Sequence, residues 1–418
     1  MKAAGVLVLL SASSALAQAD AYSPPAASQG SGLQINGYAD VGFAVAQGNG
    51  TSFAPGDTRI PADYGVDTFA TAVNSRGDVA STDSGGRFTN GFLPRSMSMG
   101  GQPSIFLSTF DVDLKYVPTI APLLLFGRVQ FLPRYGGSGN ETRVIVEQAF
   151  ARVVPFSSLE LALSIGKFDS VFGIEYLENQ ANLRTNITPS LIARYTTGTS
   201  LGIKAFYRLQ LPGIWSAISL NAAVTNGGTL VETLSPPDIS LVGRPIGSAR
   251  LGYELNLPAV EVKVGTSGEF GPRNDQHDVT VHQWLLGVDL RVVYKGLSLA
   301  AEGVKIHQDP GAADKSNGLG PQTLVSEFAA RGAYATLAYT LPVSDGALRK
   351  FTPYLRYERR RAQFEGFPAY TVDRWTIGFR LDLWDELIAK AEGLLNGEVS
   401  GLPKVDNNVF TTSFVYSF

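Results

Sequence analysis

Apolar and polar residues alternate along most of this chain from Leu33 onward. Between positions 284 and 294 every even position is apolar, while glycine, aspartate and arginine stand at 287, 289 and 291. Between 374 and 383 the odd positions are apolar and the even ones carry arginine, threonine, glycine or aspartate. A period of two places successive side chains on opposite faces of a β-strand. The pattern therefore predicts an all-β chain.

Several alternating segments are longer than the roughly 5–6 residues of an ordinary strand. They match the roughly 9–11 residues that a tilted strand needs to cross a bilayer. We predict about sixteen strands, of which 142–154 and 327–340 alternate least well. The predicted strands cover residues 33–46, 104–117, 123–135, 142–154, 159–168, 198–210, 215–226, 247–256, 259–268, 281–294, 297–307, 327–340, 351–362, 371–384, 387–395 and 408–418.

The connections between these strands alternate between short turns and longer loops. Bacterial transmembrane barrels have an even number of strands, short periplasmic turns and longer extracellular loops. They close completely, because lipid offers no water to the N–H and C=O groups of an open sheet edge. We therefore predict a transmembrane antiparallel up-and-down β-barrel over residues 33–418. The predicted long loops are 47–103, 169–197, 227–246, 269–280, 308–326 and 396–407.

The N-terminus has the pattern of an export signal. Lys2 precedes an apolar stretch that runs to Leu16, and small-x-small sites follow at 15–17 and 17–19. This pattern predicts a cleaved signal peptide over residues 1–19. Residues 20–32, which hold two prolines and several alanines, serines and glycines, are expected to be a flexible leader.

Composition narrows the function classes. The chain has no cysteine, and its net charge of −3 becomes −4 when Lys2 is removed with the signal peptide. That charge argues against a nucleic-acid partner. The histidines, at 277, 282 and 307, lack the spacing of a metal or catalytic site. We expect no cofactor, no metal and no enzymatic activity. An outer-membrane hydrolase and a surface adhesin stay open as alternatives.

In a barrel, the polar face of each strand would line a water-filled lumen. Opposed basic and acidic rows there would orient polar solutes and filter ions. We predict a porin that lets small hydrophilic solutes or ions diffuse passively; the nearly balanced charges leave its ion preference open. The predicted pore-lining residues on strands are Lys204, Arg208, Arg250, Arg291, Arg356, Glu358, Arg360 and Arg380.

Short motifs suggest a family. The stretch 166–175 reads GKFDSVFGIE and is followed by Asn179, residues 353–358 read PYLRYE, and the chain ends at Phe418 after an alternating aromatic strand. These motifs resemble those of OmpL-like β-barrel porins, which are related to phosphate-selective porins. The resemblance implies a channel in the outer membrane of a Gram-negative bacterium. The aromatic end resembles the signal by which barrel-assembly machinery recognises such chains.

Carried over to this sequence, the first motif runs from a strand end at Lys167 into a connection that reaches about Thr197. Gly173 would permit a tight bend. We expect part of this connection to fold inward and narrow the pore; an ordinary external loop is the alternative. The candidate constriction residues are Lys167, Glu175, Glu178, Arg184 and Arg194.

The outward apolar face would contact outer-membrane lipid. A homotrimer would bury part of the same face, so the oligomeric state stays open. Aromatic residues on this face, such as Trp375, Trp384 and Tyr294, are expected to form girdles at the membrane interfaces.

Overall fold

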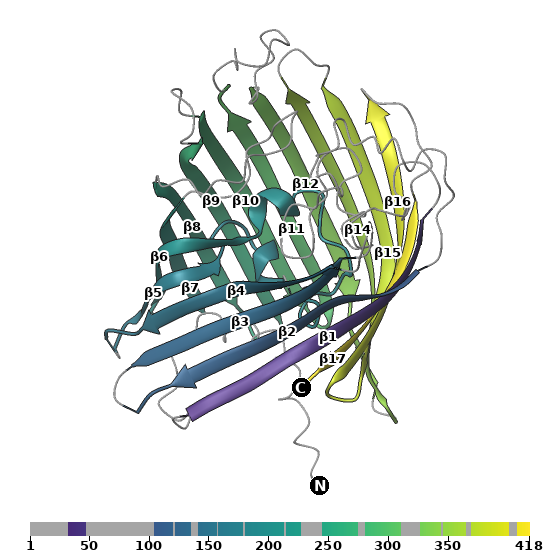
Figure 1. Ribbon diagram of the computed structural model, residues 1–418, viewed down its shortest axis with the longest axis horizontal. Helices are drawn as coiled ribbons and strands as arrows, with labels where there is room; N and C mark the ends of the chain where they lie inside the picture. The colour runs from purple at the N-terminus through teal and green to yellow at the C-terminus, as the bar shows by residue number, and fades with distance from the viewer. Residues whose placement is uncertain are drawn as a thin grey trace.

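The structure is a computed structural model in which the strands form one closed antiparallel barrel (Figure 1). It describes residues 32–46, 104–119, 122–134, 141–156, 158–178, 180–212, 215–226, 245–274, 281–310, 327–343, 346–364, 369–400 and 408–418. The predicted signal peptide, the leader up to residue 31 and the connection 47–103 lie outside these ranges. Among the described residues, no helix is long and apolar enough to cross a membrane.

Sixteen strands of 9 to 17 residues make up the barrel wall. They are β1 (Gly32–Ala46), β2 (Ser104–Val117), β3 (Leu123–Arg134), β4 (Glu141–Val153), β5 (Glu160–Asp169), β6 (Thr199–Gln210), β7 (Ser216–Asn226), β8 (Pro245–Asn256), β9 (Val260–Asn274), β10 (Val281–Tyr294), β11 (Leu297–Gln308), β12 (Phe328–Tyr339), β14 (Leu348–Phe364), β15 (Tyr370–Leu383), β16 (Leu387–Ser400) and β17 (Val409–Ser417).

These strands confirm the predicted transmembrane-type barrel. Each strand pairs with its neighbours in sequence, and β1 pairs with both β2 and β17, which closes the ring. One additional strand, β13 (Leu341–Pro342), is a two-residue extension that pairs with β14 after β12 ends. The largest boundary errors are in β9 and β16, which run six and five residues beyond the predicted ends at 268 and 395.

The two edges of the barrel differ. At one edge, β10 and β11 are joined by Lys295 and Gly296 alone, and Lys295 takes a left-handed φ of 45°. The first residue of β1 pairs with Val117 at the end of β2, and Ser417 pairs with Tyr38, so the start of β1 and the end of β17 lie at this same edge. We call it the short-turn edge and the opposite one the loop edge.

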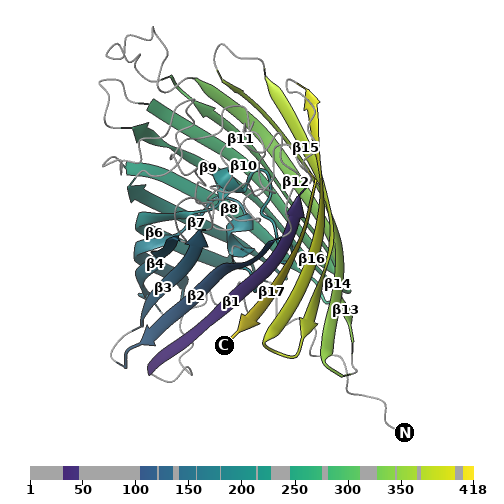
Figure 2. The same ribbon diagram turned by 45° about the vertical axis from the view of Figure 1, so that its right-hand side comes forward.

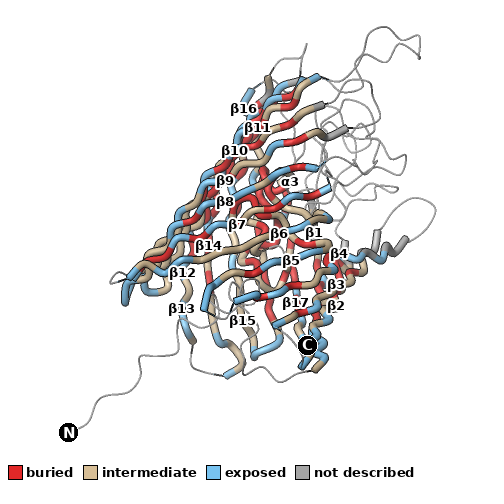
Figure 3. Tube along the Cα trace, turned by 90° about the vertical axis from the view of Figure 1, so that its left-hand side faces the viewer, coloured by how far each residue is buried: buried red, intermediate tan, exposed pale blue. Residues whose placement is uncertain are grey.

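The wall has an apolar outside and a polar inside. Figure 3 shows how exposed and buried residues alternate along the strands. On β10, Leu286 and Val288 point outward and are 57% and 63% exposed. On β14, Glu358 and Arg360 point inward and are 0% exposed. Apolar surface on this scale is rare on water-soluble monomers. The outer face therefore suits lipid.

Exposed aromatic side chains gather at the short-turn edge. Ring systems with one polar end favour the membrane interface, so these residues mark one boundary of the apolar band. Trp375 lies nearer the loop edge on β15. The aromatic residues at the short-turn edge are Tyr116, Phe156, Trp215, Tyr253, Tyr294, Tyr339, Trp384 and Tyr416.

The first and last strands meet closely around Gly37. Phe418 and Gly37 exchange two backbone hydrogen bonds of 3.0 Å, and the Phe418 ring stacks on Phe110 at 5.9 Å. A Cβ at Gly37 would lie 2.3 Å from the carbonyl oxygen of Asp111 and 2.6 Å from the Phe418 ring. Only glycine fits here without movement of the backbone.

Candidate functional site in the barrel interior

The connection from β5 to β6 lies inside the barrel (Figures 1 and 2). This internal segment, residues 170–198, carries the short helices η2 (Glu175–Glu178) and α3 (Ala193–Thr196). Phe172 and Ile192 are each 1% exposed. They pack in one apolar cluster with inward-facing residues of the wall, which include Leu285, Val304, Ile306 and Phe328.

The start of the internal segment is held by β9 and β11. The N–H of Gly173 donates to Ser267 Oγ at 3.0 Å, and the N–H groups of Ile174 and Glu175 donate to Glu302 Oε2 at 3.0 and 3.1 Å. Gly173 has a φ of +69°, which confirms the predicted bend, and a Cβ there would overlap the Glu302 carboxylate. The chain therefore bends at the Glu302 carboxylate of the wall, which accepts hydrogen bonds from two backbone N–H groups of the bend.

The middle of the segment is held by Glu392 on β16. Its carboxylate accepts hydrogen bonds from the N–H groups of Ile187 and Thr188, at 2.7 and 3.0 Å, and from the Thr188 hydroxyl. The Tyr354 hydroxyl donates to the same carboxylate at 3.0 Å. Four donors therefore surround one buried negative charge.

A third wall carboxylate, Glu358 on β14, holds the end of the segment. It accepts the N–H of Leu191 at 2.8 Å and a hydrogen bond from Arg374 Nη2 at 2.7 Å, and it pairs with Arg356. Arg374 Nη2 also donates to the Pro189 carbonyl at 2.6 Å. Buried charges are tolerated only when they are paired and hydrogen-bonded. Here the N–H of Leu191 and the carbonyl of Pro189 add the segment's hydrogen bonds to the pair of Glu358 and Arg374.

Basic wall residues bind the carbonyl groups of the segment. Lys390 Nζ donates to Ala181 O at 2.5 Å and to Arg184 O at 2.6 Å. Arg380 Nη1 donates to Leu183 O at 3.3 Å and to Arg184 O at 3.2 Å. The wall therefore supplies acceptors for the segment's N–H groups and donors for its carbonyl groups, which fixes the segment against one side of the lumen wall, from β9 to β16.

The structure places Glu175 and Arg184 inside the barrel but in separate surroundings. Glu175 accepts a hydrogen bond of 2.7 Å from the N–H of Ser190 and another from the Ser190 hydroxyl. Burial raises the pKa of this carboxyl group, and the bonds from Ser190 and the charge of Arg356 oppose the rise. Arg184 Nε donates to Asn186 O at 3.0 Å; burial lowers its pKa, while Glu392 opposes that shift.

Most of the other predicted residues face the lumen. Lys204 lies 4.8 Å from the centre of the Phe168 ring, and Arg360 Nη1 donates to the Tyr195 hydroxyl at 3.4 Å. Arg356 and Glu358 bind the end of the internal segment. Of Arg194, only the backbone position in α3 is described, and Asn179 lies outside the described residues.

A second group of charges lies toward the short-turn edge, between β5 and β10. Arg208 pairs with Glu160 at 3.0 Å and with Glu254 at 3.2 Å, and Arg250 pairs with Asp289 at 2.6 Å.

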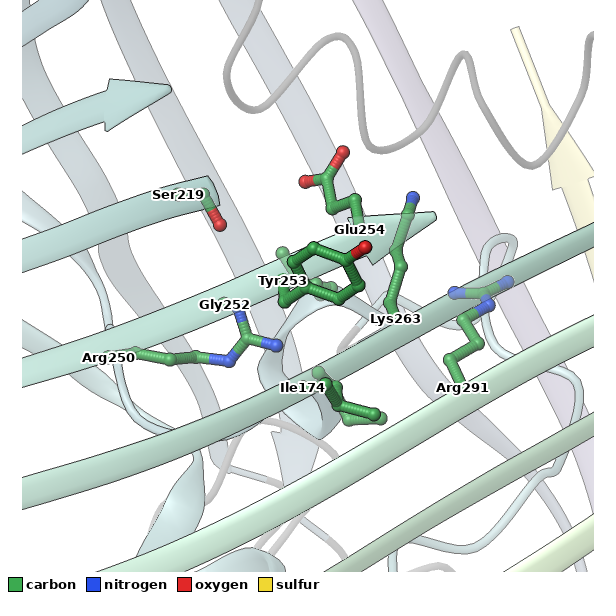
Figure 4. Close-up of a pocket in the computed structure, with 10 residues that line it drawn as sticks. Ile174, Ser219, Arg250, Gly252, Tyr253, Glu254, Lys263 and Arg291 are labelled. Atoms are coloured by element: carbon green, nitrogen blue, oxygen red, sulfur yellow. The ribbon is translucent and has the colours of Figure 1, made fainter. Parts of the chain in front are cut away.

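Figure 4 shows Glu254, Lys263 and Arg291 together, with Ile174 of the internal segment facing Arg250. Arg291 binds Glu178 of the segment at 3.2 Å. The side chains of Arg291 and Glu178 remain 24% and 33% exposed. Water therefore reaches this group, in contrast to the wholly buried Arg374 and Glu358, which are both 0% exposed.

Lys167 was predicted in the pore but points away from it. On β5 it alternates with Phe168, which is 2% exposed on the inner face, and its ammonium group donates to the Val146 carbonyl at 2.8 Å. The inner position at this strand end belongs to Phe168. Conversely, Glu302 was not predicted as a site residue. The available signal was that it is the single acidic residue on the largely apolar strand β11.

Within the described ranges, no cluster of three or more histidine and acidic side chains could hold a metal ion. His282 and His307 lie near Asp309, at 3.8 and 3.3 Å, and His277 lies outside the described residues.

Comparison with known proteins identifies the fold. No protein-family model and no curated protein sequence matches this chain. Among solved structures, the outer membrane channel DcaP of Acinetobacter baumannii is 11% identical with a TM-score of 0.53, covering 93% of this chain and 98% of its own. OmpF of Salmonella typhi, in complex with daunomycin, is 9% identical with a TM-score of 0.52 and covers 93% and 98%. The loop L8 deletion mutant of the outer membrane protein OmpT of Vibrio cholerae is 12% identical, with a TM-score of 0.50 and coverages of 93% and 100%.

Proposed function

Starting from a porin-like β-barrel of the kind found in Gram-negative outer membranes, we propose that this chain is a channel for passive diffusion of small hydrophilic solutes or ions. The observation that carries the proposal is the internal segment, which binds one side of the lumen wall through Glu302, Glu358 and Glu392. A segment fixed in this way narrows a barrel without filling it with a separate domain.

The route for solutes lies beside the segment, along β6 to β10. Arg208, Glu254, Lys263 and Arg291 on this side stay partly exposed, whereas Arg356, Glu358, Arg374, Lys390 and Glu392, which hold the segment on β14 to β16, are buried. Arg208, Lys263 and Arg291 alternate there with Glu254 and Glu178. Opposed charges across a narrow passage orient a polar solute and reduce the time it is bound.

The proposal extends to several predictions from the sequence. The motif resemblance to OmpL-like porins supports a porin, and Gly173 and Glu175 of that motif lie in the internal segment. Absence of enzymatic activity, a homotrimer in outer-membrane lipid and recognition of Phe418 by assembly machinery remain predictions. A hydrolytic signal toward lipid or peptide would favour the alternative of an outer-membrane enzyme.

Single-channel recording in a planar bilayer tests the channel. We expect the refolded chain to give stable conductance steps at a fixed voltage, and a salt gradient to give a reversal potential whose sign reports the dominant lumen charge. Folded protein, checked by β-type circular dichroism, that never conducts would contradict the proposal and would favour the enzyme or adhesin.

The pair Glu175→Gln and Arg184→Gln tests the internal segment as a constriction. Each substitution replaces a charged group with a neutral amide that can still form hydrogen bonds, so the barrel should still fold. If the segment borders the solute route, the reversal potential in a salt gradient should shift by about 5 mV or more, because fixed charge near a narrow passage sets ion selectivity. The matched control, Asp385→Asn with Lys295→Gln at exposed turn positions, should leave it unchanged. An unchanged reversal potential in the first pair would remove these two residues from the constriction.

A further inference from the structure

Four basic side chains are exposed on the outer face of the barrel toward the loop edge. They are Lys305 on β11, Arg331 on β12, and Arg359 and Arg361 on β14. Their strand neighbours confirm the direction, since the intervening Arg360 is 0% exposed on the lumen side. An outward charge near the middle of a membrane costs roughly 2–4 kcal/mol, falling to about 0–1 near the interfaces. These residues therefore need a polar environment outside the barrel.

Three of these cations stand directly side by side. Lys305 is the register partner of Arg331, and Arg331 is the register partner of Arg361. Adjacent strands are about 4.8 Å apart, and like charges directly opposite each other destabilise a sheet. We call Lys305, Arg331 and Arg361 the cation row. An anion bound between them would turn this repulsion into attraction.

The nearby carboxylates are directed elsewhere. Asp373 is the register partner of Arg359, but its Oδ1 lies over Gly397 of β16, 2.4 Å from where a Cβ would stand. Asp309 lies 3.3 Å from His307. In the part of the chain that the structure describes, no ion pair joins the cation row to a carboxylate.

The height of the cation row matches a headgroup layer. On β12, Arg331 is eight residues from Tyr339, which belongs to the aromatic belt at the short-turn edge. At about 3.3 Å per residue and a strand tilt of roughly 40°, the two lie roughly 20 Å apart along the barrel axis. The apolar band of such barrels is roughly 25 Å tall. The row thus lies roughly 5 Å inside the interface on the side of the loop edge, a distance that long lysine and arginine side chains can span.

An apolar groove continues the cation row on the outer face. The register of Lys305 runs through Leu286 and Gly268 to Ala249 on β8. The groove is shallow and open, and it is hollowed because Gly247 and Gly268 have no side chain over the strands. Lys305 Nζ lies 5.6 Å from the Trp284 ring at its border. Its outward residues are Gly247, Ala249, Gly268, Phe270, Trp284 and Leu286.

We propose that this surface binds a phosphorylated lipid of the outer leaflet, with the phosphate oxygens at the cation row and an acyl chain in the groove. Guanidinium groups bind phosphate through paired, charge-assisted hydrogen bonds, and two of them stand next to each other here. Charge complementarity selects an anionic headgroup, and the adjoining groove selects a lipid over a free anion. The inference requires a membrane location and is independent of conduction through the lumen.

The test compares two double variants with the wild type. One carries Arg331→Gln and Arg361→Gln together, and the control carries Lys295→Gln and Arg349→Gln together. The control removes two exposed cations at the short-turn edge. Each protein is held in uncharged detergent, lipopolysaccharide is added as the probe, and the thermal unfolding midpoint is followed. The wild type and the control should be stabilised, and the Arg331/Arg361 variant should need about tenfold or more lipopolysaccharide for the same shift, given the strength of charge-assisted hydrogen bonds.

Three further measurements test whether the cation row binds a phosphorylated lipid. Without lipopolysaccharide, the Arg331/Arg361 variant should be at least as stable as the wild type, because the repulsion is gone. A charge-preserving variant, Arg331→Lys with Arg361→Lys, should keep part of the response. Inorganic phosphate at equal phosphate concentration should give little shift.

Equal responses of the wild type and the Arg331/Arg361 variant would overturn the proposal. So would a full response to inorganic phosphate, which would mean an anion site without a lipid. A change in oligomer size on substitution, with an unchanged lipopolysaccharide response, would mean that a second copy of the chain covers this face.

Discussion

Replacing Glu392 with alanine should raise the single-channel conductance about twofold or more, since passage through a pore depends steeply on its narrowest section. The carboxylate holds the N–H groups of Ile187 and Thr188 and the Tyr354 hydroxyl. Replacing Glu392 removes the buried negative charge that binds these donors and that lies near Lys390. Breaking one side of a buried charge network costs about 3–5 kcal/mol, so the middle of the internal segment should leave the wall.

A matched control separates this effect from a general change of lumen charge. Glu261→Ala removes another lumen carboxylate, which pairs with Lys263 at 2.6 Å near the short-turn edge and makes no ion pair with the described residues of the internal segment. Because the Glu261 substitution leaves the internal segment in place, it should change the conductance in the same bilayer by much less than the Glu392 variant does. If the Glu392 variant folds and conducts like the wild type, the internal segment does not limit passage.

Gly37→Ala should lower the free energy of unfolding by about 1–3 kcal/mol, the usual cost of overpacking a closely packed site. The added methyl group would meet the Asp111 carbonyl oxygen at 2.3 Å and the Phe418 ring at 2.6 Å. Either β1 must move from β2 or the terminal ring must leave its place beside Phe110. Urea titration in detergent micelles, with the folded barrel followed by its resistance to denaturation in gel electrophoresis, measures the loss.

Gly127→Ala is the control for that substitution. Gly127 is also a glycine in a strand of the wall, but a Cβ there meets no atom within 4 Å. Its urea midpoint should stay at the wild-type value or rise slightly, because alanine restricts the unfolded chain more than glycine does. Equal midpoints for the two variants would show that the junction of β1 and β17 tolerates a side chain.

The fold could be predicted because the lipid face imposes a strict period of two. The bounds of β2 and β10 agree with the prediction at both ends, because apolar and polar residues alternate over most of each strand. Prediction failed where that constraint ends. β9 continues past Gly268 through Gly271 to Asn274, where glycines and Pro272 break the alternation that predicts a strand although the backbone stays paired with β10.

The interior was less predictable than the wall. Alternation places Arg356 and Glu358 in the lumen, and both are there. Which part of the internal segment each residue meets depends on how sixteen strands close, so the bonds of Glu302 and Glu392 to the segment could not be derived from sequence spacing. Lys167 was placed wrongly because its motif was assigned to the pore without its strand parity, which gives the inner position to Phe168.

The two-faced strands also bear on export. On β14, the charged residues Arg356, Glu358 and Arg360 occupy every second position, between the residues that face outward. A secretory pathway retains a segment in the inner membrane when it forms a helix of roughly 20 consecutive apolar residues. A chain whose lipid-facing residues are separated by charges presents no such helix while it is unfolded. Its affinity for lipid arises only once neighbouring strands pair, so the lumen charges allow the chain to pass the first membrane and still enter the second.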